Sequence, residues 1–489
     1  MNWQIFLSKN IVTNKNFNTG FGLVVVLFFT YQYFLFCVQP GYIDADGGIF
    51  SAIAQKMIDG AILYEDAWEN KPPGIFYLII VFMKLTPNAV NAVFFLGFSS
   101  ILLSAFAFYF IALKCTKSIL FSIAFVISIL PVVFDKGMHH DFLYTEFYGI
   151  LMILLSVLFW LIFIDKKKTY FFNLSLIFLG FSFWFKEPFF IVVVALYLYY
   201  FKSLDNKKLA WKGLFFLSIP SFVFVIVLLF SDSFWPFVDI LKYNFLYAKS
   251  DVVLPAVNKV DYILKPLITF NFPLFLLFFV SFIHLIFSRN RAQLLFLLLV
   301  LLSSLVFVFL TPYNFQHYYF PFFALFFVVT LLLLRMKLEI DKKLSFVFYF
   351  LMFYQLYGLN KNDDIKWNVK FETYNEDKFT KTIKQNKGTS LYIDIAEGAS
   401  YYAKTGLNSP TFLPVPLPVH FAENKIGIEN RTIVWNELTQ TPPDFIIRGN
   451  ELSYYNWFFE SGSFYDKKYV LIDSISGVNN KKLFLLKLK

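Results

Sequence analysis

Residues 40–77 read PGYIDADGGIFSAIAQKMIDGAILYEDAWENKPPGIFY, and they form the one long polar interruption in an otherwise apolar N-terminal region. The stretch begins directly after a membrane-length apolar run and sets two carboxylates, Asp44 and Asp46, at the predicted lipid–water boundary. It closes with Lys71 followed by two prolines, which fix the backbone and favour an extended lysine. The stretch therefore has the features of an active-site loop, with acidic groups at one end and a fixed cation at the other.

An amphipathic pattern fills the middle of this loop. Ile49, Ile53 and Met57 recur every fourth residue, and Gly60 ends the pattern. Polar residues take the other face: Ser51, Gln55, Lys56 and Asp59. Such one-sided spacing predicts a short helix that lies flat in the membrane interface and does not cross it.

Composition places the whole chain in lipid. Its 489 residues are 58% hydrophobic, include 69 Phe and have a mean hydropathy of +0.60, which excludes a soluble protein of ordinary composition. The net charge of +10 comes from lysines between apolar runs, so it predicts membrane lipids as partners and no nucleic acid. Cys37 and Cys115 fall near opposite ends of successive runs, which excludes a disulfide framework.

Apolar runs of membrane length predict about eleven spans. They cover residues 21–38, 89–113, 118–134, 147–164, 170–185, 188–201, 213–231, 270–287, 292–310, 320–334 and 344–359. Lysines before the first run predict a cytoplasmic N-terminus by the positive-inside rule. If successive spans cross the membrane in alternating directions, every loop on the cytoplasmic side contains a basic segment. This count requires that residues 75–85 form an interfacial helix and not a span. We therefore expect a mainly α, polytopic protein of the plasma (inner) membrane.

Composition changes after about residue 359, where charged residues become frequent. We expect a transmembrane domain over 1–359 and a small α/β soluble domain over 360–489, on the periplasmic or extracellular side. Short apolar runs at 391–395, 443–447, 469–472 and 483–486 predict buried strands, and residues 400–404 predict a helix closed by Gly406. The chain has no GxGxxG or P-loop spacing, which argues against nucleotide binding.

The first loop also carries a family resemblance. The order of Asp46, the amphipathic helix and Lys71-Pro72-Pro73 resembles the first external loop of the polytopic type C glycosyltransferases of family 39, which include protein O-mannosyltransferases and bacterial lipid A aminoarabinose transferases. That family often has Asp-Glu where this chain has Asp46-Gly47, so the role of that glutamate is absent here or has moved to Asp44. The resemblance implies a transferase that takes a sugar from a polyprenyl-phosphate carrier to a lipid, glycan or protein acceptor at the outer face.

The same resemblance suggests roles for four charged residues. Asp46 would be the general base of a direct displacement, which inverts the anomeric centre; alternatively it is only the N-cap of a helix that starts at Gly47. Lys71 would hold the donor phosphate, helped by Lys186, although Lys186 could instead pair with Glu187 and snorkel. Glu146 matches the family's acidic residue at the start of a span, where ionisable groups are costly and usually functional.

The remaining candidates lie in the predicted outer loops. Substrate contacts could come from Asp44, Asp141, His139, His140, Tyr64, Trp68, His317 and Tyr318. The two histidines and Asp141 are consecutive, which favours a solvated loop over a zinc site. A divalent cation between Glu146 and the donor phosphate stays open. The aromatic residues before the run at 320 could line a sugar or lipid cleft or form an interfacial belt, and they do not encode one sugar.

A lipid-linked sugar flippase or transporter is the alternative function. Transport predicts charged or helix-breaking residues near the bilayer midplane. This chain keeps its charges at the ends of the apolar runs and concentrates them in the outer loops. That distribution favours chemistry at the membrane surface, and therefore the transferase.

Overall fold

The computed structural model describes residues 15–38, 43–133, 142–247, 256–286, 291–309, 316–336, 377–415, 425–449, 468–476 and 482–489. The residues that the structure describes are mostly helical (75%) and include one small sheet. The chain divides into two compact units. We call Met1–Val38, Phe98–Phe224 and Ser250–Phe371 the bundle unit, and Gln39–Gly97, Val225–Lys249 and Glu372–Lys489 the sheet unit.

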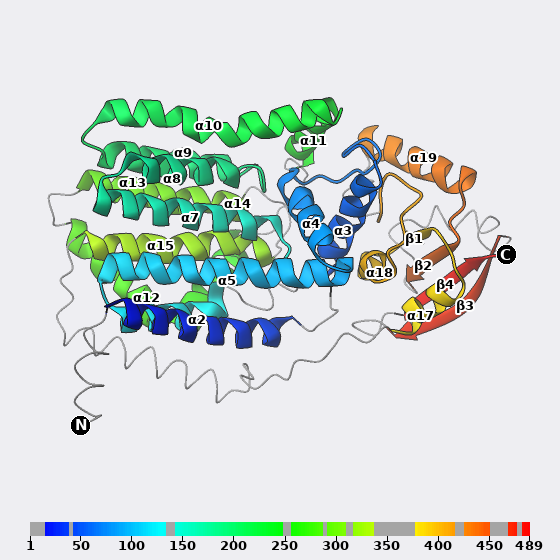
Figure 1. Cartoon of the computed structure of the whole chain (residues 1–489), viewed down its shortest axis with the longest axis horizontal. Helices are drawn as coiled ribbons and strands as arrows, with labels where there is room; N and C mark the ends of the chain where they lie inside the picture. The colour runs from blue at the N-terminus through cyan, green and yellow to red at the C-terminus, as the bar shows by residue number, and fades with distance from the viewer. Residues whose placement is uncertain are drawn as a thin grey trace, which may run out of the picture. The chain divides into compact units, whose positions relative to one another are not determined.

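Apolar helices make up most of the bundle unit, and Figure 1 draws the long ones side by side along the horizontal direction. The helices are α2 (Lys15–Cys37), α5 (Ala89–Thr116), α6 (Ile119–Val133), α7 (Thr145–Lys166), α8 (Thr169–Ser182), α9 (Phe189–Ser203), α10 (Lys207–Phe230), α12 (Ala256–Ile286), α13 (Arg291–Ser304), α14 (Val306–Phe309), the 3-10 turn η1 (Gln316–Tyr319) and α15 (Phe320–Arg335). Ten of the predicted apolar runs therefore lie on helices; the run at 344–359 lies outside the described residues. The start of α5 and the end of α10 belong to the sheet unit.

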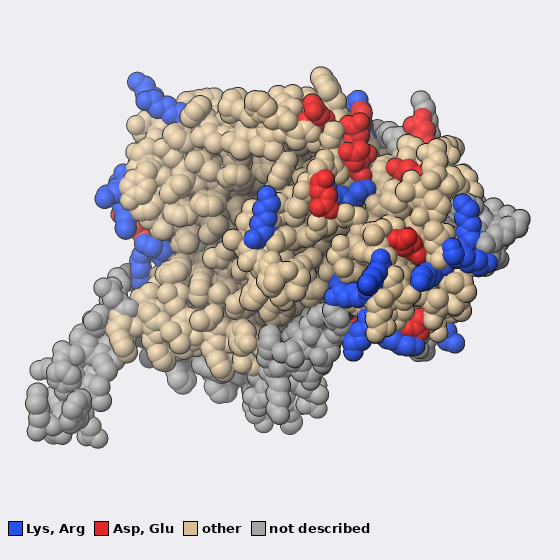
Figure 2. Space-filling model, turned by 45° about the vertical axis from the view of Figure 1, so that its right-hand side comes forward, with Lys and Arg blue, Asp and Glu red and all other residues tan. Residues whose placement is uncertain are grey.

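Five of the described helices are long and apolar enough to cross a membrane, or six if a bent pair within α12 counts as one span. Shorter apolar helices accompany them, among them α6, α8 and α9. Figure 2 shows an almost uncharged surface over these helices. Helix α12 begins at Ala256, before the start of the apolar run predicted at 270–287.

Charged residues at the ends of three helices meet in the bundle unit. Asp165 of α7 accepts hydrogen bonds from Lys114 of α5 (2.9 Å) and from Arg335 of α15 (2.8 Å). All three residues lie in or beside segments that the sequence assigned to one side of the membrane. The alternation of spans predicted that these helix ends share one side of the membrane; which side they face stays a prediction.

The sheet unit combines the first loop with the C-terminal segment. It contains α3 (Ala45–Ile58), α4 (Gly74–Leu85), α11 (Phe234–Tyr247), α17 (Lys378–Gln385), the 3-10 turn η2 (Ala396–Gly398), α18 (Ser400–Thr405) and α19 (Lys425–Gln440). Its strands are β1 (Leu391–Ile393), β2 (Phe445–Gly449), β3 (Tyr469–Ser476) and β4 (Lys482–Leu488). The sheet order is β1-β2-β4-β3, with β1 and β2 parallel and the other pairs antiparallel.

The structure confirms the local predictions for this unit. Each predicted strand overlaps an observed one, and α18 ends at Gly406 in the left-handed conformation (φ 71°). Helix α3 ends at Ile58, and Gly60 has φ +101°. The apolar face of α3 packs on α4, with Phe50 edge-on to Phe76 (ring centroids 5.7 Å apart). The predicted boundary between residues 359 and 360 lies outside the described residues.

Candidate functional site

Two carboxylates stand at the N-terminus of α3, in the sheet unit. Asp44 is the N-cap residue, with an extended backbone and no capping hydrogen bond from its side chain. Asp46 lies in the first turn of the helix and is half-buried. The alternative that Asp46 caps a helix starting at Gly47 is therefore wrong, because the helix starts two residues earlier. A carboxylate in a first helical turn is stabilised by the partial positive charge of the helix N-terminus.

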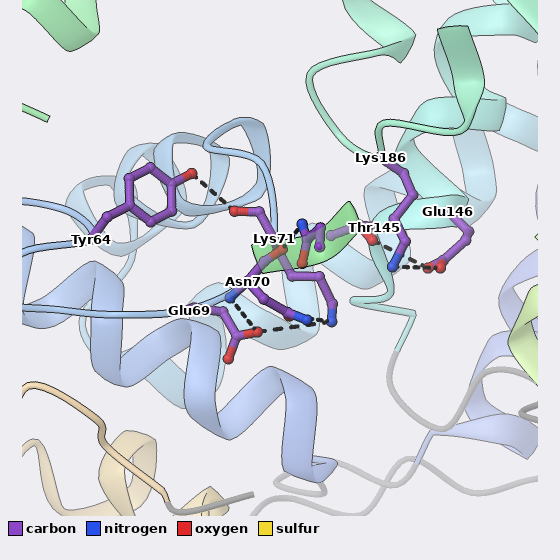
Figure 3. Close-up of polar contacts among 8 residues, drawn as sticks. Tyr64, Glu69, Asn70, Lys71, Thr145, Glu146 and Lys186 are labelled. Atoms are coloured by element: carbon purple, nitrogen blue, oxygen red, sulfur yellow. Dashed lines mark hydrogen bonds and ion pairs between the residues drawn. The ribbon is translucent and has the colours of Figure 1, made fainter. Parts of the chain in front are cut away.

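Lys71 lies immediately before the two prolines, and Pro73 is the N-cap of α4. Its ammonium donates to Asn70 Oδ1 (2.9 Å) and lies 3.8 Å from Glu69 Oε1. Glu69 is almost fully buried and accepts the Asn70 backbone N–H (2.9 Å). Figure 3 shows the three side chains converging at this turn. The lysine is therefore held at a set point, as the sequence predicted, by two neighbours that the sequence analysis missed.

Aromatic packing on α11 fixes the rest of the loop. The Tyr64 hydroxyl donates to the Lys71 carbonyl (2.9 Å), and its ring lies 5.6 Å from that of Phe237. The Trp68 ring meets Tyr243 edge-on at 5.2 Å. Asn244 Nδ2 donates to the Asn70 carbonyl (2.7 Å). Tyr64 and Trp68 are both buried, so they hold the loop; their role as sugar contacts stays a prediction.

A buried ion pair joins two other predicted residues, in the bundle unit. Lys186 Nζ lies 3.1 Å from Glu146 Oε1, and the two side chains are 12% and 1% exposed. Thr145 Oγ1 donates to the second Glu146 oxygen (3.2 Å). Figure 3 shows Lys186 reaching the Glu146 carboxylate. The sequence offered Glu187 as the local partner of Lys186; the structure gives it Glu146, 40 residues away in the chain.

Close helix packing brings this pair together. Glu146 lies in the first turn of α7, and Lys186 lies between α8 and α9. A Cβ atom at Gly149, one turn after Glu146, would lie 2.0 Å from the Phe189 ring at the start of α9. Only glycine lets that ring pack so close to α7. This packing positions the connection between α8 and α9, which contains Lys186, beside Glu146.

The turn η1 adds aromatic rings beside the same lysine. Lys186 Nζ lies 5.4 Å from the centroid of the Tyr318 ring, within the range of a cation–π contact. His317 stacks on Tyr144 with ring centroids 4.2 Å apart and an interplanar angle of 11°. Glu146, Lys186, His317 and Tyr318, all predicted as site residues, thus belong to one cluster. The predicted His139, His140 and Asp141 lie outside the described residues.

Lys259 is a further cation that the sequence analysis missed. It lies near the start of α12, is 2% exposed, and donates to the Val308 carbonyl (2.8 Å). A signal existed, because a lysine on a helix that continues into an apolar run is a functional candidate. Lys259 was overlooked because the apolar run was predicted to begin only at residue 270.

The described side chains do not by themselves form a metal site at Glu146. Among the residues that the structure describes, no three His, Cys, Asp or Glu side chains come close enough to hold an ion. Lys186 places a cation against Glu146 Oε1, which opposes a second cation there.

Comparison with known proteins identifies the fold. No family model matches the sequence, and no curated protein matches it. Two solved structures are similar over most of this chain. ArnT from Cupriavidus metallidurans, bound to undecaprenyl phosphate, matches with 11% identity and a TM-score of 0.56, over 96% of this chain and 98% of ArnT. The Archaeoglobus fulgidus oligosaccharyltransferase, in complex with Zn and sulfate, matches with 11% identity and a TM-score of 0.52, over 95% of this chain and 72% of that chain.

These likenesses show that the chain has the fold of polytopic type C membrane glycosyltransferases, as the first loop predicted.

Proposed function

We propose that this chain is an integral membrane glycosyltransferase that moves a sugar from a polyprenyl-phosphate carrier to an acceptor at the outer face of the plasma membrane, with inversion. The observation that carries the proposal is Lys71, which is fixed between the Glu69–Asn70 turn and the start of α4, in a unit that also presents Asp46. The likeness in fold to a protein bound to undecaprenyl phosphate supports a lipid-linked donor.

In the proposed reaction Asp46 accepts the proton of the acceptor hydroxyl. The hydroxyl oxygen forms a bond to the anomeric carbon while the bond from that carbon to the phosphate oxygen breaks. The bonding electrons leave with the polyprenyl phosphate, whose negative charge rises. One attack from the face opposite the phosphate inverts the anomeric centre.

Lys71 is proposed to stabilise the leaving phosphate. A cation about 4 Å from a unit negative charge, at an effective dielectric near 20, contributes on the order of 4 kcal/mol before solvation costs. A lysine acts here as a point charge, and charge that develops in the transition state is where such a group assists catalysis most. A phosphate contact by Lys186 stays a prediction; in the structure Lys186 pairs with Glu146.

The proposal is tested with purified protein, a panel of polyprenyl-phosphate sugars, and mass spectrometry of membrane lipids and proteins. We expect a mass increase of one sugar on an acceptor, dependent on the lipid-phosphate donor. Asp46→Asn should fold normally and lose about 10²- to 10⁴-fold in turnover. The matched control is Glu65→Gln, since Glu65 is an exposed carboxylate of the same loop.

Three results would contradict the proposal. Near wild-type turnover of the Asp46→Asn protein would show that Asp46 is not the base, and Asp44 or Glu146 would then be the candidates. Transfer that depends on a nucleotide sugar would show that the donor is not a polyprenyl-phosphate sugar. Movement of an unmodified lipid across liposome membranes, without transfer, would favour the flippase.

A further inference from the structure

Helix α3 is held at both ends by the C-terminal segment of the sheet unit, and this arrangement bears on Asp46. The first contact is at Gly48, two residues after Asp46. A Cβ atom there would lie 2.4 Å from the Ala399 carbonyl carbon and 2.7 Å from the Ser400 nitrogen. Both are backbone atoms at the start of α18 and cannot move aside as a side chain would. The first turn of α3 therefore rests directly on the C-terminal backbone.

The second contact is at Lys56, in the last turn of α3. Its ammonium donates to the carbonyl of Asp66 in the first loop (2.7 Å) and to the carbonyl of Thr411 in the C-terminal segment (2.8 Å). Burial lowers the pKa of Lys56, and the nearby charges of Glu437 and Asp66 oppose this effect. A lysine desolvated in this way serves as a fixed donor that joins three segments.

Neighbouring hydrogen bonds extend this attachment. Asn408 Nδ2 donates to Asp59, the C-cap residue of α3 (2.6 Å). The Phe412 backbone is held on both sides, because its carbonyl accepts the Trp68 N–H (2.9 Å) and its N–H donates to Glu437 of α19 (3.1 Å). The polar face of α3, which the sequence placed toward water, is thus partly an interface with the C-terminal segment.

We propose that contacts with the C-terminal segment fix the position of Asp46, and that Lys56 is the positioning residue through which this segment holds α3. This inference rests on the proposed function, in which Asp46 is the base. A helix fixed at Gly48 and at Lys56 can neither slide nor tilt without breaking backbone packing or two hydrogen bonds. The C-terminal α/β part therefore completes the catalytic loop and is not an independent appended domain.

Lys56→Met in the full-length protein tests this inference. It removes both hydrogen bonds and keeps an unbranched side chain that is only one atom shorter. We expect kcat to fall by about tenfold to 100-fold, the cost of a misplacement near 1 Å, with KM for the donor within about twofold because Lys71 is untouched. Hydrogen exchange of the α3 amides should become faster. Lys56→Arg, which keeps the donors, should restore both readouts.

Two further variants make the test decisive. Lys84→Met is the matched control, because Lys84 is an exposed lysine in the last turn of the neighbouring α4; kcat and hydrogen exchange should stay at wild-type values. Asn408→Ala removes the hydrogen bond to Asp59 in an exposed position and should give the same changes in smaller size. It replaces Lys56→Met if that variant does not fold.

The readouts separate this inference from the proposed function. Unchanged α3 exchange in Lys56→Met, or a kcat that stays at the wild-type value, would overturn the positioning role. If the α3 amides exchange faster in Lys56→Met but Asp46→Asn is fully active, the attachment of α3 stands and the role of Asp46 as the base is overturned. Equal losses in kcat and in donor affinity would indicate general disruption of the loop and would also overturn the inference.

Discussion

The two predicted phosphate-binding lysines, Lys186 and Lys71, differ in how tightly each is joined to a carboxylate. In the bundle unit, Lys186 meets Glu146 at 3.1 Å and the carboxylate is 1% exposed. In the sheet unit, Lys71 lies 3.8 Å from Glu69, while Asn70 accepts its hydrogen bond. The first lysine neutralises a carboxylate buried among apolar helices, and the second donates to a neutral amide beside a more distant carboxylate. We infer that Lys186 matters most for folding.

The largest expected effect is on the stability of the bundle unit. Lys186→Met removes the cation beside a buried carboxylate, and breaking such a pair on one side costs about 3–5 kcal/mol of unfolding free energy. The variant should melt well below the wild type in detergent. The double variant Glu146→Gln, Lys186→Met should recover most of the loss, because no buried charge is left behind.

Lys242→Met is the matched control for this comparison. Lys242 pairs with Asp239 at 2.8 Å, but both side chains are largely exposed, so its loss should cost less than about 1 kcal/mol. If Lys186→Met melted like Lys242→Met, the ion pair in the bundle unit would have no structural role.

The next effect is on donor binding at the sheet unit. Lys71→Ala should weaken binding of a polyprenyl phosphate by more than about tenfold, since tenfold corresponds to only about 1.4 kcal/mol of the expected phosphate interaction. Its melting temperature should change less than that of Lys186→Met, because Glu69 keeps the Asn70 N–H. Binding is measured directly with the purified protein, and Lys242→Ala is the control. Unchanged affinity together with unchanged turnover would remove Lys71 from the site.

The contrast between the pairs also explains what the sequence could predict. Glu146 and Lys186 stand out because ionisable residues are rare at the ends of apolar runs and are costly there. Glu69, Asn70 and Lys56 lie among many polar residues, so nothing in the local sequence distinguishes them. Their roles arise from contacts with distant segments, and no local periodicity encodes such contacts.

The fold follows the same rule. The apolar runs predicted the helices. Strand patterns, and capping signals such as Gly406, predicted the elements of the C-terminal segment. The assembly of the first loop with that segment was not predicted, because Lys56 and Thr411 are separated by 355 positions. The start of α12 was missed because Asn258, Lys259 and Asp261 interrupt the apolar pattern there.

A separate expected effect, on the pH dependence of stability, concerns a buried carboxylate without a lysine partner. Asp394 follows β1 and is 3% exposed, and its Oδ1 has no hydrogen-bond partner among the described residues. Burial raises its pKa from 3.8 to about 8, and the charge of Arg448 partly opposes this shift. Between these two pKa values the folded protein holds a proton that the unfolded chain has lost.

The free energy of unfolding should therefore fall as the pH rises from about 4 to about 8, and Asp394 should add no further change above that. Asp394→Asn should remove this contribution, so its melting temperature relative to wild type should rise across that range, by about 2–4 °C for each ~1 kcal/mol. Melting curves at several pH values measure the difference, with the exposed Asp239→Asn as control. A constant difference between variant and wild type would show that Asp394 stays ionised.

The bond from Lys56 to Thr411 also has a consequence for biosynthesis. The first loop leaves the ribosome early, yet its partner in the C-terminal segment is made 355 residues later. At about 5–20 residues per second, this interval lasts on the order of tens of seconds. During that time α3 lacks the backbone at Ala399 on which its first turn rests, so the nascent loop must wait in an incomplete state. Translation that stops before residue 399 should leave an inserted but inactive protein, and quality control of the chain must tolerate that delay.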